Sequence, residues 1–228
     1  MTAFLNGVFL PLADAKVSAL DRGFVFGDGV YEVVPVYSGK PFRLDAHLSR
    51  LQASLDAIRL ANPYAIAQWR EWVLKLIALQ DFSDQSLYVQ VTRGAPAPGQ
   101  PLRDHAFPAN PSPTVFMFAQ PLVVATPRQK AAGVCAITVA DDRWLRCDIK
   151  AISLLANVLL RQRALDAGCA EAVLLRDGFL TEGAASNIFV VQDGVLVAPP
   201  RSNLMLTGIT YDVVLELAAA HAIPHEVR

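Results

Sequence analysis

The chain contains only five lysines, so the surroundings of each can be compared. Lys150 differs from the others because it follows the segment RWLRCDI and leads into the apolar run AISLLANVLL. A lysine at the mouth of an apolar helix is partly desolvated, which lowers its pKa and favours the neutral, nucleophilic amine. The alternative is a helix-start lysine with its ammonium group in water, and the local context alone favours this alternative.

Glu182 is a candidate partner for a cationic ring nitrogen. It lies in the small-residue segment TEGAASN, which the hydrophobic residues 188–191 follow. Small residues let a flat ligand approach the backbone closely, and a carboxylate at this point could pair with a protonated ring. A solvated glutamate in a turn is the alternative, and for an isolated glutamate it is the commoner situation.

Two features could bind a phosphate group. The segment Thr207-Gly208-Ile209-Thr210 opens a predicted helix, whose free N–H groups and positive dipole end favour an anion. This signal is weak, because many helices begin with Thr and Gly for capping alone. Arg50 lies near His47 beside the apolar stripe of its helix, and its guanidinium could hold a phosphate bidentately. An ordinary surface arginine is the usual alternative.

A long loop, residues 94–113, contains six of the fifteen prolines together with Arg103 and His105. A loop of this length within a compact domain is usually functional. Two cationic side chains on one loop can hold a carboxylate, although exposed Arg and His are common on any surface.

These candidates complement one another. They supply a nucleophilic lysine, a carboxylate for a ring nitrogen, groups for a phosphate and a cationic trap for a carboxylate. Those are the requirements of a pyridoxal-phosphate site that acts on amino acids.

Other chemistries lack their motifs. The Gly-rich segment DRGFVFGDGVYE does not have the strand-first context of a dinucleotide site, and no Gly-Lys-Ser/Thr loop or Gly-x-Ser-x-Gly elbow occurs. No His/Cys cluster has metal spacing, so we expect no metal. Lys and Arg total 20 against 21 Asp and Glu, and the resulting charge of −1 gives no general attraction to nucleic acid or to an anionic membrane.

The three cysteines, Cys135, Cys147 and Cys169, indicate reduced thiols in a cytoplasmic protein rather than a disulfide framework. The N-terminus lacks the basic start of a secretory signal, and no apolar run is long enough for a membrane span. Another strand would begin at His225, so we expect the sequence to stop before the natural C-terminus.

The elements that position these residues fall into two predicted domains, 1–120 and 121–228. In the first we expect strands at 3–6, 8–10, 30–37, 86–94 and 114–119, and helices at 44–60 and 64–80. Asn6-Gly7 is a strong hairpin signal, and Pro35 within a strand indicates an edge or a bulge. In the second we expect strands at 134–140, 171–175, 187–192 and 195–198, and helices at 153–167 and 209–221.

Five segments carry a resemblance to a known family: DRGFVFGDGVYEVV, HLSRL, RWLRCDIKAISLLANVLL, TEGAASNIF and LTGIT, in that order. Together they closely resemble the fold-type IV pyridoxal-phosphate enzymes, and within them the D-amino-acid aminotransferases. The resemblance extends from about residue 2 to the last residue. It implies an α+β fold with a small α/β N-terminal domain, a larger β-rich pseudo-barrel C-terminal domain, and the cofactor between them.

The resemblance also implies roles for individual residues. Lys150 would form the Schiff base with pyridoxal 5′-phosphate, and Glu182 would keep the pyridine nitrogen protonated. Tyr31, Arg103 and His105 would trap the substrate α-carboxylate, with the Arg-x-His part reaching in from the partner subunit of a homodimer. The implied cofactor-binding set is Arg50, Lys150, Glu182, Ser186, Asn187, Leu206, Ile209 and Thr210.

The activity implied is ping-pong transamination between a D-amino acid and a 2-oxo acid such as 2-oxoglutarate or pyruvate. A branched-chain L-amino-acid aminotransferase and an aminodeoxychorismate lyase share the fold, and the segment Arg103-Asp104-His105 favours the D-amino-acid enzyme. The family's serines after Glu-Gly are replaced by Ala184-Ala185, leaving Ser186, so hydrogen bonds to the cofactor would be lost. This departure motivates a non-enzymatic alternative, a silent cofactor-binding protein.

Overall fold

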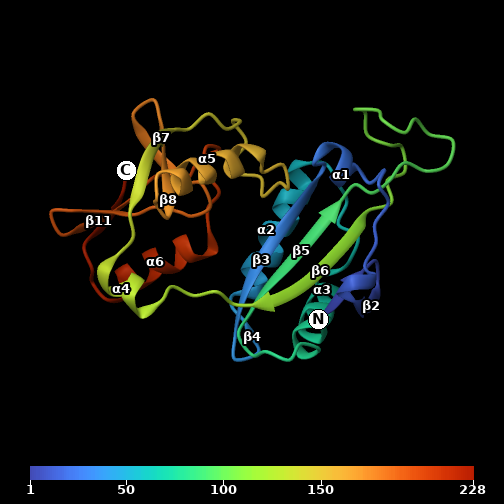
Figure 1. Ribbon diagram of the computed structural model, residues 1–228, viewed down its shortest axis with the longest axis horizontal. Coiled ribbons are helices and arrows are strands. Elements are labelled where there is room, and N and C mark those ends of the chain that lie inside the picture. Colours follow the sequence, from blue (N-terminus) through green and yellow to red (C-terminus); the bar gives the residue numbers. More distant parts are fainter. The chain divides into compact units, whose positions relative to one another are not determined.

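The computed structural model describes residues 1–228, and the chain divides into two compact units (Figure 1). Unit 1 comprises residues 1–124 together with 150–153, and unit 2 comprises residues 125–149 together with 154–228. The chain therefore leaves unit 2 for one short segment, and that segment carries Lys150. Helices and sheets occur in both units, which confirms the predicted α+β class.

Unit 1 is built on a six-stranded antiparallel sheet in the order β2-β1-β6-β5-β3-β4. Its strands are β1 (Thr2–Leu5), β2 (Val8–Pro11), β3 (Gly29–Tyr37), β4 (Lys40–Pro41), β5 (Gln85–Thr92) and β6 (Thr114–Pro121). Asn6 and Gly7 both have positive φ, as the predicted tight hairpin turn requires. β4 covers only the end of β3, so Pro35 lies at an almost free edge, as predicted.

Two helices, α2 (Leu44–Ala57) and α3 (Ile66–Ala78), cover one face of this sheet (Figure 1). Most of the apolar stripes predicted for them are confirmed, because the buried side chains are spaced three and four residues apart: Leu48, Leu51, Leu55, Trp69, Val73, Leu76 and Ile77. Ile58, predicted in the first stripe, is only half-buried, and Ile66, predicted in the second, is exposed. Each fully buried side chain of this size contributes roughly 1.5–3 kcal/mol to folding. A short 3₁₀ turn (Leu12–Asp14) and the short helix α1 (Arg22–Phe26) complete the unit.

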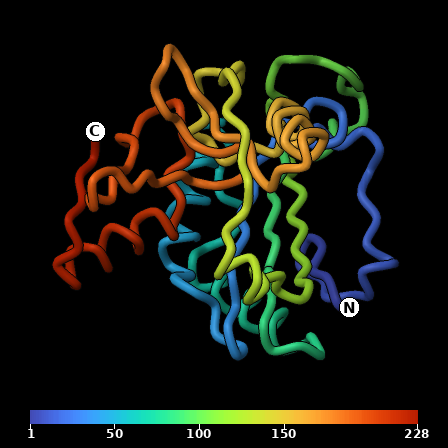
Figure 2. Tube along the Cα trace, turned by 60° about the vertical axis from the view of Figure 1, so that its left-hand side comes forward, coloured from blue at the N-terminus to red at the C-terminus, as the bar shows by residue number.

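The loop predicted between two strands joins β5 to β6 and contains no helix or strand. In Figure 2 it is the green segment at the edge of the sheet, beside the blue segment that contains α1.

Unit 2 contains two three-stranded sheets. In one, β7 (Ala136–Ala140) is parallel to β8 (Glu171–Arg176), and β9 (Phe179–Gly183) is antiparallel to β8. In the other, β10 (Val190–Gln192) is antiparallel to β11 (Val195–Ala198), which is parallel to β12 (His225–Val227). The helices α5 (Leu155–Asp166) and α6 (Ile209–Ala220) are the crossovers that the parallel pairs need.

Five elements of the structure were not predicted: the 3₁₀ turn, α1, β4, α4 (Pro127–Ala132) and β9. The two helices are too short to show an apolar period. The strand predicted at 187–192 begins only at Val190, because Asn187 makes side-chain hydrogen bonds at this point.

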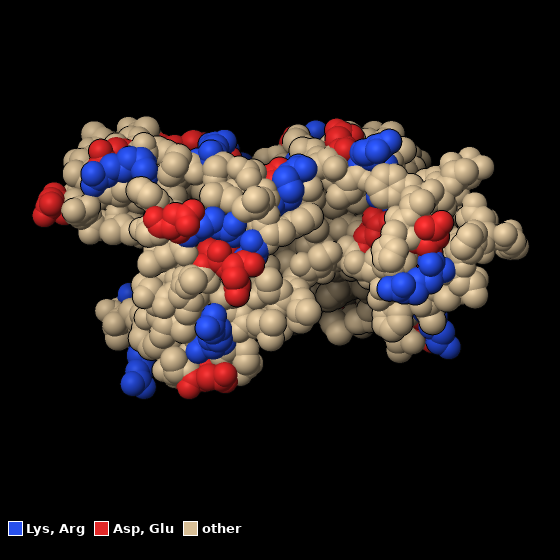
Figure 3. Space-filling view, turned by 90° about the horizontal axis from the view of Figure 1, so that it is seen from above, with Lys and Arg blue, Asp and Glu red and all other residues tan.

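Positive and negative side chains are interspersed over the face drawn in Figure 3. Every helix of the structure is too short or too polar to cross a membrane. The chain also has no group of three or more His, Cys, Asp or Glu side chains arranged to hold a metal ion.

Candidate active site

Lys150 is held against β3 in unit 1. Its carbonyl oxygen accepts a hydrogen bond from the Tyr31 backbone N–H at 3.0 Å, and its own N–H donates to the Ser54 hydroxyl at 3.3 Å. The Lys150 Nζ lies 4.1 Å from the centroid of the Tyr31 ring, a cation–π distance. The predicted position at the mouth of a helix is wrong, because α5 begins only at Leu155 and pairing with β3 fixes the lysine instead.

Arg50 lies on α2 and forms a bidentate ion pair with Glu32. Its Nε and one terminal nitrogen lie 2.7 and 2.8 Å from the two carboxylate oxygens, and His47 Nδ1 donates at 2.8 Å to one of them. Burial alone would raise the pKa of Glu32, but the hydrogen bonds from Arg50 and His47 hold it below its ordinary value. The predicted phosphate ligand is therefore oriented by a buried carboxylate.

The sequence contained a signal for Glu32 that the motif reading missed. In the strand GVYEVVPVY, Glu32 alternates with Val30 and Val34 on the buried face. A carboxylate at an inward position requires a cationic partner, and the helix predicted at 44–60 carries Arg50 and His47.

Glu182 is buried in β9 rather than lying in an open small-residue segment. One carboxylate oxygen accepts from Arg143 at 2.5 Å, and the other accepts from the Leu206 backbone N–H at 3.1 Å and from the Asn187 amide at 3.4 Å. Burial raises the pKa of Glu182 above its ordinary value, and the hydrogen bond from Arg143 does not cancel this effect.

Arg143 and Asp141 are functional candidates that motif reasoning missed. Arg143 donates to both oxygens of Asp141 at 2.9 Å, and all three side chains of this Asp141–Arg143–Glu182 cluster are buried. Asp141 also accepts from Thr181 and pairs with Arg176. Because Arg143 gives two hydrogen bonds to Asp141, it gives only one to Glu182.

Asn187 joins Glu182 to the start of α6. Its amide donates to the carbonyl of Leu206 at 2.9 Å, and its oxygen accepts from the N–H of Gly208 at 2.9 Å. A Cβ at Gly208 would lie 2.2 Å from that oxygen, so only glycine permits this approach. No side chain caps α6, whose first residues are the predicted phosphate ligands Ile209 and Thr210.

The remaining predicted residues have other contacts. Ser186 donates its hydroxyl to Glu171 at 2.7 Å. Arg103 and His105 both pack on the ring of Phe26, at 5.2 and 5.3 Å. Their contacts are thus with Phe26 rather than with Tyr31, whose ring stacks on Tyr88.

The prediction that all three cysteines are free thiols is wrong for two of them. Cys135 and Cys169 form a disulfide, because they lie one and two residues before the parallel strands β7 and β8 and their Cα atoms are 4.9 Å apart. Cys147 is a free, buried thiol, and burial raises its pKa.

Known proteins share this sequence and fold. The family model described as amino-transferase class IV matches residues 29–228. The D-alanine aminotransferase of Staphylococcus epidermidis is 41% identical over 221 residues, which cover 97% of this chain and 77% of the relative. The D-alanine aminotransferase of Bacillus licheniformis is 38% identical over 228 residues, covering 100% and 78%.

A solved structure is also similar. The branched-chain amino acid aminotransferase of Escherichia coli has a TM-score of 0.86 and 26% identity. The match covers 100% of this chain and 77% of that chain.

Proposed function

This chain belongs to the class IV aminotransferases, and we propose that it transfers the amino group of a D-amino acid to a 2-oxo acid by a ping-pong mechanism. The likeness to two D-alanine aminotransferases supports the D-amino-acid substrate. Its cofactor is pyridoxal 5′-phosphate, the cofactor of this family.

The observation that carries the proposal is Lys150. Both its N–H and its carbonyl make hydrogen bonds within unit 1, and its amine lies over the ring of Tyr31, a predicted substrate-binding residue. A fixed amine on an apolar ring suits a nucleophile that must also move protons.

The residues of each unit fit pyridoxal phosphate. In unit 2, burial raises the pKa of the Glu182 carboxyl and the hydrogen bond from Arg143 offsets this only in part, so a pyridinium N–H would stabilise its ionised form. The uncapped start of α6 suits the phosphate. In unit 1, Lys150 supplies the amine and Arg50 a guanidinium already oriented by Glu32.

The mechanism assigns each residue one task. When bound, the cofactor supplies a ring that accepts electrons from the substrate Cα. Lys150 Nζ removes the Cα proton and later returns one. Glu182 keeps the ring nitrogen protonated, and Arg143 orients Glu182 while Asn187 ties it to α6. Arg103, His105 and Tyr31 hold the α-carboxylate.

An absorbance experiment tests this proposal. The purified protein should absorb as a lysine-bound pyridoxal enzyme, and D-alanine should change the spectrum while L-leucine does not. With 2-oxoglutarate present, D-alanine should turn over. Turnover of L-leucine instead would favour the branched-chain enzyme, and pyruvate release from aminodeoxychorismate the lyase. A pyridoxal spectrum without any turnover would support the silent cofactor-binding protein.

Chemical labelling tests the lysine assignment separately. Borohydride reduction followed by peptide mapping should place the cofactor on Lys150. A label on Lys130 or on another lysine would refute the assignment without refuting the activity.

The proposal includes a homodimer in which the loop of one subunit serves the site of the other. It is supported by the position of Arg103 and His105 on a long, exposed loop between β5 and β6 rather than within the sheet. Mixing inactive Lys150→Ala subunits with Arg103→Ala subunits, which should bind D-alanine weakly, should then restore turnover at low D-alanine concentration, because some mixed dimers have one intact site. Failure of mixtures that exchange subunits would exclude sharing.

We also place the enzyme in the cytoplasm, where small amino acids and 2-oxo acids are exchanged. The disulfide between Cys135 and Cys169 makes this part of the proposal testable, because cytoplasmic thiols are usually kept reduced. Cell fractionation should find the activity in the cytoplasmic fraction. Activity found only outside that fraction, with the Cys135–Cys169 disulfide intact, would refute this placement.

A further inference from the structure

The two ends of the loop that carries Arg103 and His105 lie in contact, at Gly94 and Ser112. Gly94 has φ +80°, and a Cβ there would lie 1.8 Å from the carbonyl oxygen of Ser112, so the two ends of the loop touch. The Gly94 carbonyl accepts from the backbone N–H of Arg22 at 2.9 Å. The first residue of α1 is thereby attached to the point where the loop leaves the sheet.

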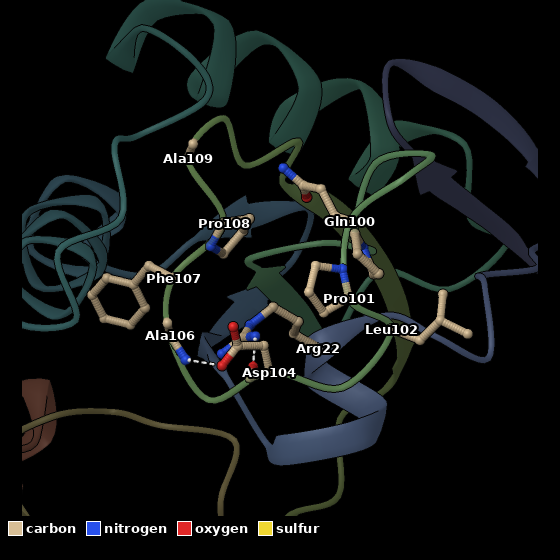
Figure 4. Close-up of a pocket in the computed structure, with 10 residues that line it drawn as sticks. Arg22, Gln100, Pro101, Leu102, Asp104, Ala106, Phe107, Pro108 and Ala109 are labelled. Carbon is tan, nitrogen blue, oxygen red and sulfur yellow. Dashed lines mark hydrogen bonds between the residues drawn. The ribbon is translucent and has the colours of Figure 1, made fainter.

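Arg22 extends from α1 into the body of the loop. Its guanidinium donates to the carbonyls of Asp104 and His105 at 2.5 and 3.4 Å, as the close-up shows for Asp104 (Figure 4). Of the ten residues that line the pocket in Figure 4, nine belong to the loop and the tenth is Arg22. The loop is therefore folded around this arginine.

Arg22 is held in turn by Asp28 and Arg93. Asp28 accepts from Arg22 Nε at 2.8 Å and from two nitrogens of Arg93 at 2.8 and 3.0 Å. Arg93 also donates to the carbonyl of Ile58 at the end of α2, and its guanidinium lies 3.8 Å from the centroid of the Phe107 ring. The Asp28 carboxylate thus connects two arginines that contact the loop at different points, Arg22 at the carbonyls of residues 104 and 105 and Arg93 at the Phe107 ring.

The side chains of Arg103 and His105 rest on the same short helix. Both pack on Phe26, and Arg22 lies over that ring as well, at 4.7 Å. α1 is fixed to the sheet, because Asp21 caps its start and accepts from the Thr114 hydroxyl at 2.6 Å. The orientation of both side chains is therefore set by α1 and not by the loop alone.

We propose that Arg22, supported by Asp28 and Arg93, is a positioning residue that holds the 94–113 loop so that Arg103 and His105 meet the substrate carboxylate preorganised. This inference rests on the proposed carboxylate trap. Backbone carbonyls are suitable targets, because bonds to the carbonyls of Asp104 and His105 fix the chain within the trap without occupying its side chains. A loop held in its binding conformation avoids the ordering cost that substrate would otherwise meet.

The first test is the substitution Arg22→Met, which keeps the length of the side chain but removes every donor. The Michaelis constant for D-alanine should rise roughly tenfold, equivalent to about 1.4 kcal/mol, while cofactor content stays at the wild-type level. The matched control is Arg70→Met, which removes an exposed arginine that pairs with Asp45 in the same unit. The control should leave the kinetics unchanged.

A double-mutant comparison separates positioning from a direct role. If Arg22 acts through Arg103 and His105, adding Arg22→Met to the double variant Arg103→Ala with His105→Ala should not weaken D-alanine binding further. Additive losses would overturn the inference. Wild-type kinetics in Arg103→Ala would refute the trap itself, which is a different failure.

A structural readout does not depend on substrate. In the holoenzyme, Arg22→Met should speed proteolytic cleavage and amide hydrogen exchange within residues 95–111 at least several-fold, but not in β5 or β6. Unchanged loop protection would overturn the inference. Should Arg22→Met fail to fold, Arg22→Lys retains a charge for Asp28 but cannot fork to both carbonyls, and the same outcomes decide for that variant.

Discussion

Each unit contains a buried glutamate that bonds to an arginine, and the two carboxylates differ in how fully the protein neutralises them. Glu32 in unit 1 takes two hydrogen bonds from Arg50 and one from His47. Glu182 in unit 2 takes one from Arg143, which gives two others to Asp141. The pKa of Glu32 is lowered and that of Glu182 is raised, although burial pushes both upward.

The comparison distinguishes a carboxylate that is fully paired within the protein from one that can still accept a cationic partner. A buried charge is tolerated only where cationic donors offset its lost hydration. At Glu32 the protein supplies them, so the group serves to orient Arg50. At Glu182 the cationic donors are too few to offset the lost hydration, so a cationic ligand that binds there would gain the most electrostatic stabilisation. We infer that the position with the raised pKa is the one left for the cofactor ring.

The largest effect should follow from Glu182→Gln. An amide cannot hold the ring nitrogen protonated, so turnover should fall about a thousandfold or more, which corresponds to about 4 kcal/mol. Steady-state assays with D-alanine and 2-oxoglutarate measure this, and Glu71→Gln on the exposed face of α3 is the control. A fall of less than tenfold would show that another group protonates the ring.

Local patterns in the sequence predicted much of the frame around these two glutamates. The Asn6-Gly7 turn and the stripes of α2 and α3 depend on neighbours a few residues apart, so they are visible without a fold. The motif reading also selected Lys150 and Glu182. It did not see that Glu182 is buried, because β9 forms through pairing with β8, and Thr-Glu-Gly alone has little strand propensity.

Interactions between distant residues account for the rest. Arg143 reaches Glu182 across 39 positions of sequence, and Arg22 reaches the Asp104 carbonyl across 82. Cys135 and Cys169 meet only because β7 and β8 are parallel in the register that sets Ala136 opposite Glu171. No local pattern contains such a register, so neither the ion clusters nor the disulfide could be predicted from spacing.

Glu32→Gln should chiefly reduce stability. It leaves the partly buried guanidinium of Arg50 beside a neutral amide, and loss of one partner of a buried pair costs about 3 kcal/mol. Urea unfolding of the cofactor-free protein should show this decrease, with Glu71→Gln changed by less than about 0.5 kcal/mol. A neutral result at Glu32 would mean that His47 and Arg50 find other partners, and the comparison would fail.

The two glutamates should also respond to pH in opposite senses. Because the pKa of Glu32 is lowered on folding, its stabilisation is present above the unfolded-state pKa of about 4.3 and is lost as pH falls through the folded pKa. The pKa of Glu182 is raised, so its ionisation weakens the fold as pH rises from the unfolded to the folded pKa. The wild-type advantage over Glu32→Gln should shrink toward acid pH, whereas that over Glu182→Gln should grow. Equal slopes in the unfolding free energies would contradict the difference between the clusters.

The smallest effect tests the cause of the difference. The negative charge of Asp141 raises the pKa of Glu182 and also competes for Arg143. Asp141→Asn removes that charge and frees guanidinium capacity, so the pKa of Glu182 should move down toward its ordinary value. The carboxyl signal of Glu182 can be followed by ¹³C NMR, identified by its absence in Glu182→Gln. Loss of the Thr181 and Arg176 contacts should lower stability at the same time, so the titration is compared only within the folded range. An unmoved or higher pKa would mean that burial alone raises the pKa of Glu182 and that the competition of Asp141 for Arg143 does not contribute.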